Sequence, residues 1–198
     1  MNRDENQLKV LCTNLNKISP ISDNEWEIAK PFFDYNYFEK KEHVVEMEEI
    51  VDKLYFITSG MARYYYLTED GKEFNKSFQV AGQVLTSISS LVNKTLSPFY
   101  IETIIPTECI SITYNNLKLL GEKSPQWNRL NFSLLEQVLI RKEGREADFL
   151  LLDATQRYEK FLKEFSDVAT KIPNYHIASY LGITEVRLSR IRNNLNLT

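Results

Sequence analysis

The stretch Ile177–Ile191 reads IASYLGITEVRLSRI, and its spacing of small and apolar residues predicts two short helices joined by a tight turn. Ala178 would stand where the two helices cross, because a larger side chain would push them apart. Gly182 can adopt the positive φ that ends the first helix, and Thr184 can cap the second by accepting a backbone hydrogen bond. The stretch therefore predicts a helix-turn-helix.

The second helix of this motif presents a candidate DNA-binding surface. Leu188, Ile191 and Leu195 recur at helical spacing and would face inward, which turns the opposite face outward. An arginine on that face can bond two acceptors of a guanine at once, and we expect Arg190 to read a base in this way. The alternative is an ordinary surface helix with solvated arginines. The candidate DNA-binding residues are Thr184, Glu185, Val186, Arg187, Ser189, Arg190, Arg192 and Asn193.

The composition favours a globular regulator that touches nucleic acid at one place. The chain has 198 residues, 43% of them hydrophobic, enough for one large or two small domains. No apolar run approaches the ~18 residues of a membrane span, and the N-terminus MNRDENQLKV is too polar for a signal peptide. We therefore expect a cytoplasmic protein without a membrane partner. The net charge is −3, but basic residues outnumber acidic ones from Ala154 to Thr198.

Metal, cofactor and enzyme chemistry find little support in the sequence. Cys12 and Cys109 are far apart and too few for a disulfide framework or an iron-sulfur cluster. His43 and His176 are the two histidines, and we expect both to be structural or surface residues rather than metal ligands. No Ser/His/Asp or Cys/His arrangement is evident. We expect no metal, no cofactor and no enzymatic activity.

Upstream of the motif, the pattern predicts a β-roll preceded by helices. Two helices are expected before Tyr35, the second capped by Ser22. From Tyr35 to Thr113 the hydrophobic period becomes two, with strands on either side of a bend at Gly60 and a hairpin turn at Asp70-Gly71. Short strands of this kind predict an antiparallel, jelly-roll-like sheet.

A long helix is predicted from Ser124 to Leu152. Its apolar stripe suggests a dimerisation helix with Leu134 in the seam, and the alternative is a helix lying on its own barrel. Gly144 weakens the middle by roughly 1 kcal/mol relative to alanine. The stripe consists of Trp127, Leu130, Leu134 and Val138, widened by Leu135 and Leu139.

The predicted fold is α+β, with three parts. Residues 1–123 would form the β-roll domain with its N-terminal helices, 124–152 the dimerisation helix, and 153–198 a helix-turn-helix domain lacking a wing. The last part would begin with a helix capped by Asp153 and ending before Ile172-Pro173, which forms the floor of the motif.

This order of elements resembles the Crp/Fnr family of bacterial transcription regulators over about residues 20–196. The resemblance implies a cyclic-nucleotide-binding-like β-roll and a homodimer whose two recognition helices enter successive major grooves of double-stranded DNA, about 34 Å apart. RNA polymerase is a further candidate partner. The similar segments are the strand pair with Gly60, EDGKE at Glu69–Glu73, Gly82, LDATQR at Leu152–Arg157, and IASYLGITEVRLSRIR.

The region that would hold a ligand departs from the family. Members that bind a cyclic nucleotide have Gly-Glu for the ribose and Arg-Ser or Arg-Thr for the phosphate, where this chain has Thr86-Ser87 and Ser97-Pro98. A buried anion without a cation or several N–H donors costs several kcal/mol, so we expect no response to cyclic nucleotide unless Lys94 substitutes. Thr86, Ser87 and Ser97 are candidate pocket residues for another small-molecule effector, or they satisfy polar turns and there is no effector.

The predicted DNA-binding end of the chain also departs from the family pattern. Many members carry Pro-Glu or Arg-Glu where this chain has Glu185-Val186, and the chain ends at Thr198, so a β-hairpin wing is not expected. Base preference therefore does not transfer. We expect a homodimeric transcription regulator; the alternative is a regulator-like protein with weakened DNA binding that acts through protein-protein contacts.

Overall fold

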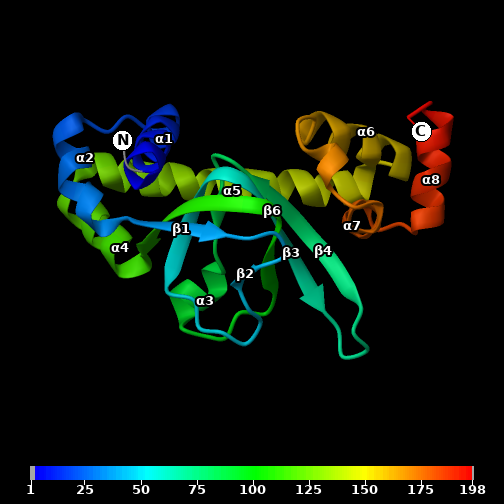
Figure 1. The fold of residues 1–198 in the computed structure, drawn as a ribbon, viewed down its shortest axis with the longest axis horizontal. Coiled ribbons are helices and arrows are strands. Elements are labelled where there is room, and N and C mark those ends of the chain that lie inside the picture. The colour runs from blue at the N-terminus through cyan, green and yellow to red at the C-terminus, as the bar shows by residue number, and fades with distance from the viewer. Residues whose placement is uncertain (1–2, 198) are drawn as a thin grey trace.

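A long helix, α5, runs along the molecule, and a β-roll lies beside its middle (Figure 1). The computed structural model describes residues 3–197. The first two helices and α4 gather at one end of α5, and the last three helices gather at the other end. The helices are α1 (Arg3–Ile18), α2 (Asp23–Ala29), α3 (Ile88–Asn93), α4 (Tyr114–Lys123), α5 (Pro125–Leu151), α6 (Ala154–Glu164), α7 (Asn174–Leu181) and α8 (Glu185–Asn194), with short 3-10 turns η1 (Lys30–Phe32) and η2 (Ala169–Lys171).

The sheet is antiparallel throughout, which confirms the predicted β-roll in an α+β fold. Its main path runs β1-β6-β3-β4, with β2 beside β6 and β5 beside β3, so β4 lies at one end of the path. The strands are β1 (Asp34–Phe38), β2 (His43–Val45), β3 (Lys53–Leu67), β4 (Glu73–Val80), β5 (Val84–Leu85) and β6 (Tyr100–Thr113).

The two predicted turns of the β3 region have different outcomes. The hairpin at Asp70-Gly71 forms as predicted, with Gly71 at φ +78°. Gly60 does not separate two strands, because β3 continues through it with a shift in its register against β6. Gly60 has φ +106°, and a Cβ there would lie 2.6 Å from the Cα of Thr107. The expected bend is therefore a glycine bulge inside one long strand.

Helix α5 has one face packed against the rest of the chain and one face exposed. Trp127 and Leu130 are buried against α1, α2 and α4, and Leu134 packs on the same cluster. Leu134 is partly buried against the chain's own body, and its place in a dimer seam stays a prediction. The opposite side leaves large apolar side chains exposed, including Phe132, Leu135, Leu139 and Ile140.

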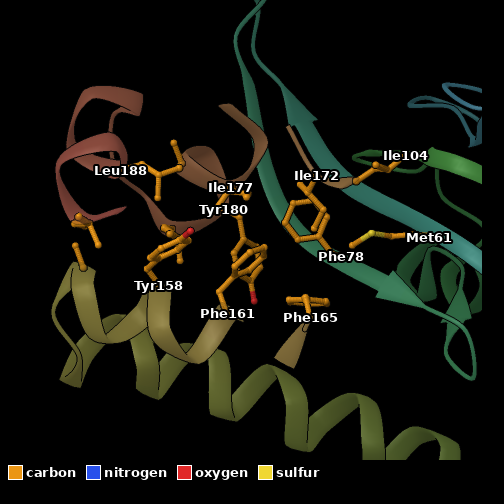
Figure 2. Close-up of a cluster of buried hydrophobic side chains, with 14 residues drawn as sticks. Met61, Phe78, Ile104, Tyr158, Phe161, Phe165, Ile172, Ile177, Tyr180 and Leu188 are labelled. Carbon is orange, nitrogen blue, oxygen red and sulfur yellow. The ribbon is translucent and has the colours of Figure 1, made fainter. Parts of the chain in front are cut away.

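The C-terminal helices share one hydrophobic core with the β-roll (Figure 2). Asp153 and Gln156 form a capping box at the start of α6, as predicted. The apolar face of α6 packs beneath α7 and against Phe78 of β4, whose ring centroid lies 6.1 Å from that of Phe161 and 5.1 Å from that of Tyr180. Other members of this cluster are Met61, Ile104, Tyr158, Phe165, Ile172, Ile177, Ala178, Leu181, Leu188 and Ile191.

Two expectations about this region change. Helix α6 ends at Glu164, and a turn and η2 lead to Ile172, so the helix is shorter than predicted. The expected boundary at residue 153 falls between α5 and α6, but the shared core extends across it. The division into 1–123, 124–152 and 153–198 stays a prediction.

Candidate nucleic-acid interface and effector region

Helices α7 and α8 form the predicted helix-turn-helix arrangement. Gly182 ends α7 at φ +68°, and its N–H donates to the carbonyls of Ala178 and Ser179. Thr184 caps α8, its hydroxyl accepting from the Arg187 N–H at 3.2 Å. Phe149 of α5 packs against the turn, since a Cβ on Gly182 would lie 3.0 Å from its ring. Both the backbone and the packing therefore favour glycine at this position.

The outer face of α8 is open to solvent at the end of the molecule farthest from α1 (Figure 1). Leu188 and Ile191 are buried, as the periodicity predicts. Val186 stands 64% exposed, between the one acidic residue of the helix, Glu185, and Arg187. The exposed candidate residues are Thr184, Glu185, Val186, Arg187, Ser189, Arg190 and Asn193.

Arg192 is held differently from the other two arginines of α8. Its Nη1 donates to Oδ1 of Asn174 at 2.6 Å, and its Nη2 donates to the Leu197 carbonyl at 3.1 Å. It therefore ties the end of α8 to the start of α7. Arg187 and Arg190 are exposed, and their guanidinium groups have no intramolecular partner within residues 3–197.

Helix α7 is fastened to both the roll and α5. The Ser179 hydroxyl accepts from the Asn75 N–H at 2.9 Å and donates to the Glu73 carbonyl at 3.3 Å, so it bonds the outer backbone of β4. Arg145 of α5 donates to the Tyr180 carbonyl at 2.8 Å and lies over the Tyr180 ring at 3.8 Å. These contacts fix the position of the motif relative to the roll.

A buried arginine completes this junction. Arg63 of β3 donates to the carboxylates of Glu73 at 2.6 Å and Glu102 at 3.2 Å. It also donates to Nδ1 of His176 at 3.3 Å, and the Asn75 amide donates to the same nitrogen at 3.2 Å. Because Nδ1 accepts both bonds, the imidazole proton resides on Nε2. Burial, and then the charge of Arg63, lower the pKa of His176 to about 4.

The candidate pocket residues are engaged by the backbone. The Thr86 hydroxyl donates to the Lys53 carbonyl at 2.9 Å, and the Ser97 hydroxyl donates to the Phe99 carbonyl at 2.9 Å. Ser87 is fully buried. A ligand would therefore compete with existing bonds at two of the three residues. Their role in effector binding stays a prediction.

Positive charge near the candidate pocket residues also comes from β4, which the sequence pattern does not link to them. Lys76 of β4 lies 3.9 Å over the Phe99 ring and 5.7 Å over the Tyr64 ring. The Tyr64 hydroxyl in turn accepts from the Thr86 N–H at 2.9 Å. Burial, and then the charge of Lys142, lower the pKa of Lys76 to about 8. Lys76 of β4 thus adds positive charge beside Phe99, at the end of a segment whose own cation is Lys94.

Comparison with known proteins agrees with this architecture. Residues 35–124 match the family described as cyclic nucleotide-binding domain. The structure of FixK2 from Bradyrhizobium japonicum is 22% identical, with a TM-score of 0.72, over 83% of this chain and 84% of that one. The chain has the fold of the Crp/Fnr regulators.

Two further structures share the Crp/Fnr fold. CLP, a c-di-GMP responsive global regulator from Xanthomonas campestris, is 16% identical, with a TM-score of 0.69, over 88% of this chain and 92% of that one. A CooA variant from Carboxydothermus hydrogenoformans is 20% identical, with a TM-score of 0.66, over 86% and 78%. No curated protein sequence matches the chain significantly.

Within residues 3–197, no cluster of three or more His, Cys, Asp or Glu side chains is suited to hold a metal ion. Cys12 and Cys109 are free thiols. In the same part of the chain no helix has the length and apolar character needed to cross a membrane.

Proposed function

We propose that this protein is a homodimeric transcription regulator that binds double-stranded DNA through α8. The observation that carries the proposal is the division of α8 into two faces. Leu188 and Ile191 hold one face in the core, while Arg187 and Arg190 stand exposed on the other. A recognition helix needs this arrangement, because its outer face must enter the major groove while its inner face is fixed.

The outer face offers groups for both kinds of DNA contact. Arg190 is the residue assigned to a guanine, where two parallel hydrogen bonds are available. Val186 can contact a thymine methyl group, and Glu185 can accept from a cytosine amino group or simply favour the helix N-terminus. Thr184, Arg187, Ser189 and Asn193 are assigned to the phosphate backbone and neighbouring base edges, with Arg192 holding the helix in position.

A second copy of this chain is the proposed occupant of the exposed face of α5. Fully burying one large apolar side chain contributes roughly 1.5 to 3 kcal/mol, so pairing two such helices gives a substantial driving force. A two-fold pair would place each exposed residue in a symmetric contact and present two recognition helices together. The exposed large apolar residues of α5 are Phe132, Leu135, Leu139, Ile140, Phe149, Leu150 and Leu151.

Cyclic nucleotide is not the proposed effector. The Thr86 and Ser97 hydroxyls already donate to carbonyls, and Pro98 has no N–H to offer a phosphate. The regulator is proposed to act in the cytoplasm, with RNA polymerase as a candidate partner. Adding cyclic AMP or cyclic GMP should leave its DNA affinity unchanged, whereas a marked increase would refute this part of the proposal.

A salt-titrated binding assay tests the DNA-binding role. Labelled promoter fragments are titrated with the protein at a series of salt concentrations, and native mass spectrometry measures the oligomeric state. The logarithm of the binding constant should fall linearly with the logarithm of the salt concentration, with a slope that reports several phosphate contacts per dimer. Absence of binding to every fragment at low salt would favour action through protein-protein contacts instead.

A further inference from the structure

A cavity of about 500 Å³ lies between the β-roll and α7. It is large enough for a metabolite, since ligand sites range from about 300 to 1,000 Å³. Its walls come from the turn between β1 and β2, from β3, β4 and β6, and from the first turn of α7. The cavity is separate from the region of Thr86, Ser87 and Ser97, none of which lines it.

The charges of the cavity wall are unevenly paired. Arg63 is paired with Glu73 and Glu102, whose two negative charges exceed its single positive charge. Lys40 and Lys41 also line the cavity and are exposed, and within residues 3–197 neither makes an ion pair. The Lys41 backbone is fixed in the left-handed region at φ +66° by a bond from its N–H to the Thr103 carbonyl at 2.9 Å. The backbone of Lys41 is therefore fixed at the cavity, and its ammonium group has no ion-pair partner within residues 3–197.

His176 adds a donor that has no acceptor within residues 3–197. The residue as a whole is 6% exposed, and it lines the cavity. Its Nδ1 accepts from Arg63 and Asn75, which leaves the proton on Nε2, and within residues 3–197 no group accepts from Nε2. Lys41 lines the same cavity, and its charge contributes slightly to lowering the pKa of His176.

The first turn of α7 opens on the same cavity. Its N-cap residue is Pro173, which offers no side-chain acceptor, and Pro173, Tyr175 and His176 all line the cavity. The first N–H groups of a helix lack intrahelical acceptors and carry partial positive charge. The uncapped turn, the Nε2–H of His176 and the ammonium of Lys41 are therefore three kinds of donor around one space.

We propose that this cavity binds a small molecule bearing a phosphate or carboxylate group, which accepts from Lys41, from Nε2 of His176 and from the first turn of α7. Lys41 belongs to the roll and His176 to the helix-turn-helix, so the anion bridges the two and stabilises their contact. An effect of the anion on DNA affinity follows only if the proposed function holds.

The two histidines of the chain make the test specific. The imidazole nitrogens of His43 and His176 give two sets of signals in long-range ¹⁵N–¹H correlation spectra, assigned with His176→Gln. The full-length protein is titrated with inorganic phosphate and, separately, with succinate. At least one anion should shift the His176 signals saturably and leave the His43 signals nearly unchanged. The anion that saturates the shift at the lower concentration shows whether phosphate or carboxylate is preferred.

Matched lysine variants complete the test. Lys41→Ala should weaken anion binding about tenfold, because it removes a charge-assisted hydrogen bond. Lys123→Ala, at the far end of α4, should bind as the wild type does. The proposal is overturned if neither anion shifts His176, if both histidines shift alike, or if the two lysine variants behave the same. No DNA is present in this experiment, so its result is independent of the DNA-binding assay.

Discussion

Arg63 donates from Nη1 to Nδ1 of His176 over 3.3 Å, and this bond joins strand β3 to the first helix of the helix-turn-helix. Arg63→Met would remove the bond and leave the carboxylates of Glu73 and Glu102 without their cation. Because Glu102 is largely buried, the free energy of unfolding should fall by about 3 kcal/mol in a urea titration. Arg3→Met removes an exposed arginine from Glu108, which keeps its bonds from Gln7 and Tyr35, so it should lower stability much less. Equal effects of the two variants would contradict the role assigned to Arg63.

His176 should make stability depend on pH in the weakly acidic range. Its pKa in the folded protein is lowered from 6.5 to about 4, so between these values the unfolded chain binds a proton that the folded protein does not. The free energy of unfolding should therefore decrease as the pH falls through this window, by at most about 1.4 kcal/mol per pH unit. Urea unfolding between about pH 5 and pH 7 measures this slope. His176→Gln should flatten it and His43→Gln should not; an unchanged slope in His176→Gln would exclude the mechanism.

Leu139→Arg should convert the proposed dimer into monomers. Leu139 is 56% exposed on the outer face of α5, and an arginine there would place unpaired charge in the seam between two helices. Sedimentation velocity measures the oligomeric state. Leu96→Arg is the matched control, because Leu96 is 53% exposed but lies on the loop after α3. A dimer that persists in Leu139→Arg would place the interface elsewhere.

Arg190→Ala should weaken binding to the specific DNA site by about 1 to 3 kcal/mol and relax the preference at one base position. Arg187→Ala, if Arg187 contacts phosphate, should weaken binding to all sequences alike and reduce the salt slope. Both side chains are exposed, so neither change should alter thermal stability. Fluorescence anisotropy with specific and scrambled duplexes distinguishes the two effects. Unchanged specific binding by Arg190→Ala would show that another residue reads the base.

Two glycine-to-alanine changes should have opposite effects on the stability of the protein. Gly182→Ala places a side chain at φ +68° and a Cβ 3.0 Å from the Phe149 ring, so it should destabilise the protein by about 1 to 2 kcal/mol. Gly144→Ala lies inside α5 with open space around its Cβ and should stabilise by about 0.5 to 1 kcal/mol. Thermal unfolding monitored by circular dichroism measures both. A stabilising Gly182→Ala would contradict the turn geometry.

Features fixed by local sequence could be predicted well. Gly182, the Thr184 cap and the capping box of Asp153 with Gln156 each depend on neighbours within a few positions, so their spacing is visible in the chain. The Asp70-Gly71 hairpin belongs to the same class. These local features are enough to locate the helix-turn-helix and much of the roll from the sequence.

The remaining features depend on contacts between distant segments. The apolar stripe of α5 is so wide that periodicity could not show that Leu134 packs on the chain's own body. The bond between Arg63 and His176 spans 113 positions, and no spacing rule connects these two residues. Lys41 likewise reaches the cavity only through the turn between β1 and β2.

Strand β4 is the last strand on the main path of the sheet, and Ser179 of α7 bonds its Asn75 N–H and its Glu73 carbonyl. Unpaired strand edges recruit strands from other molecules, which leads to aggregation. The first helix of the helix-turn-helix thus shields the roll from association with other copies through β4. Fragments that end before α6 would expose this edge together with Met61, Phe78 and Ile104, so the roll prepared alone should be prone to precipitate.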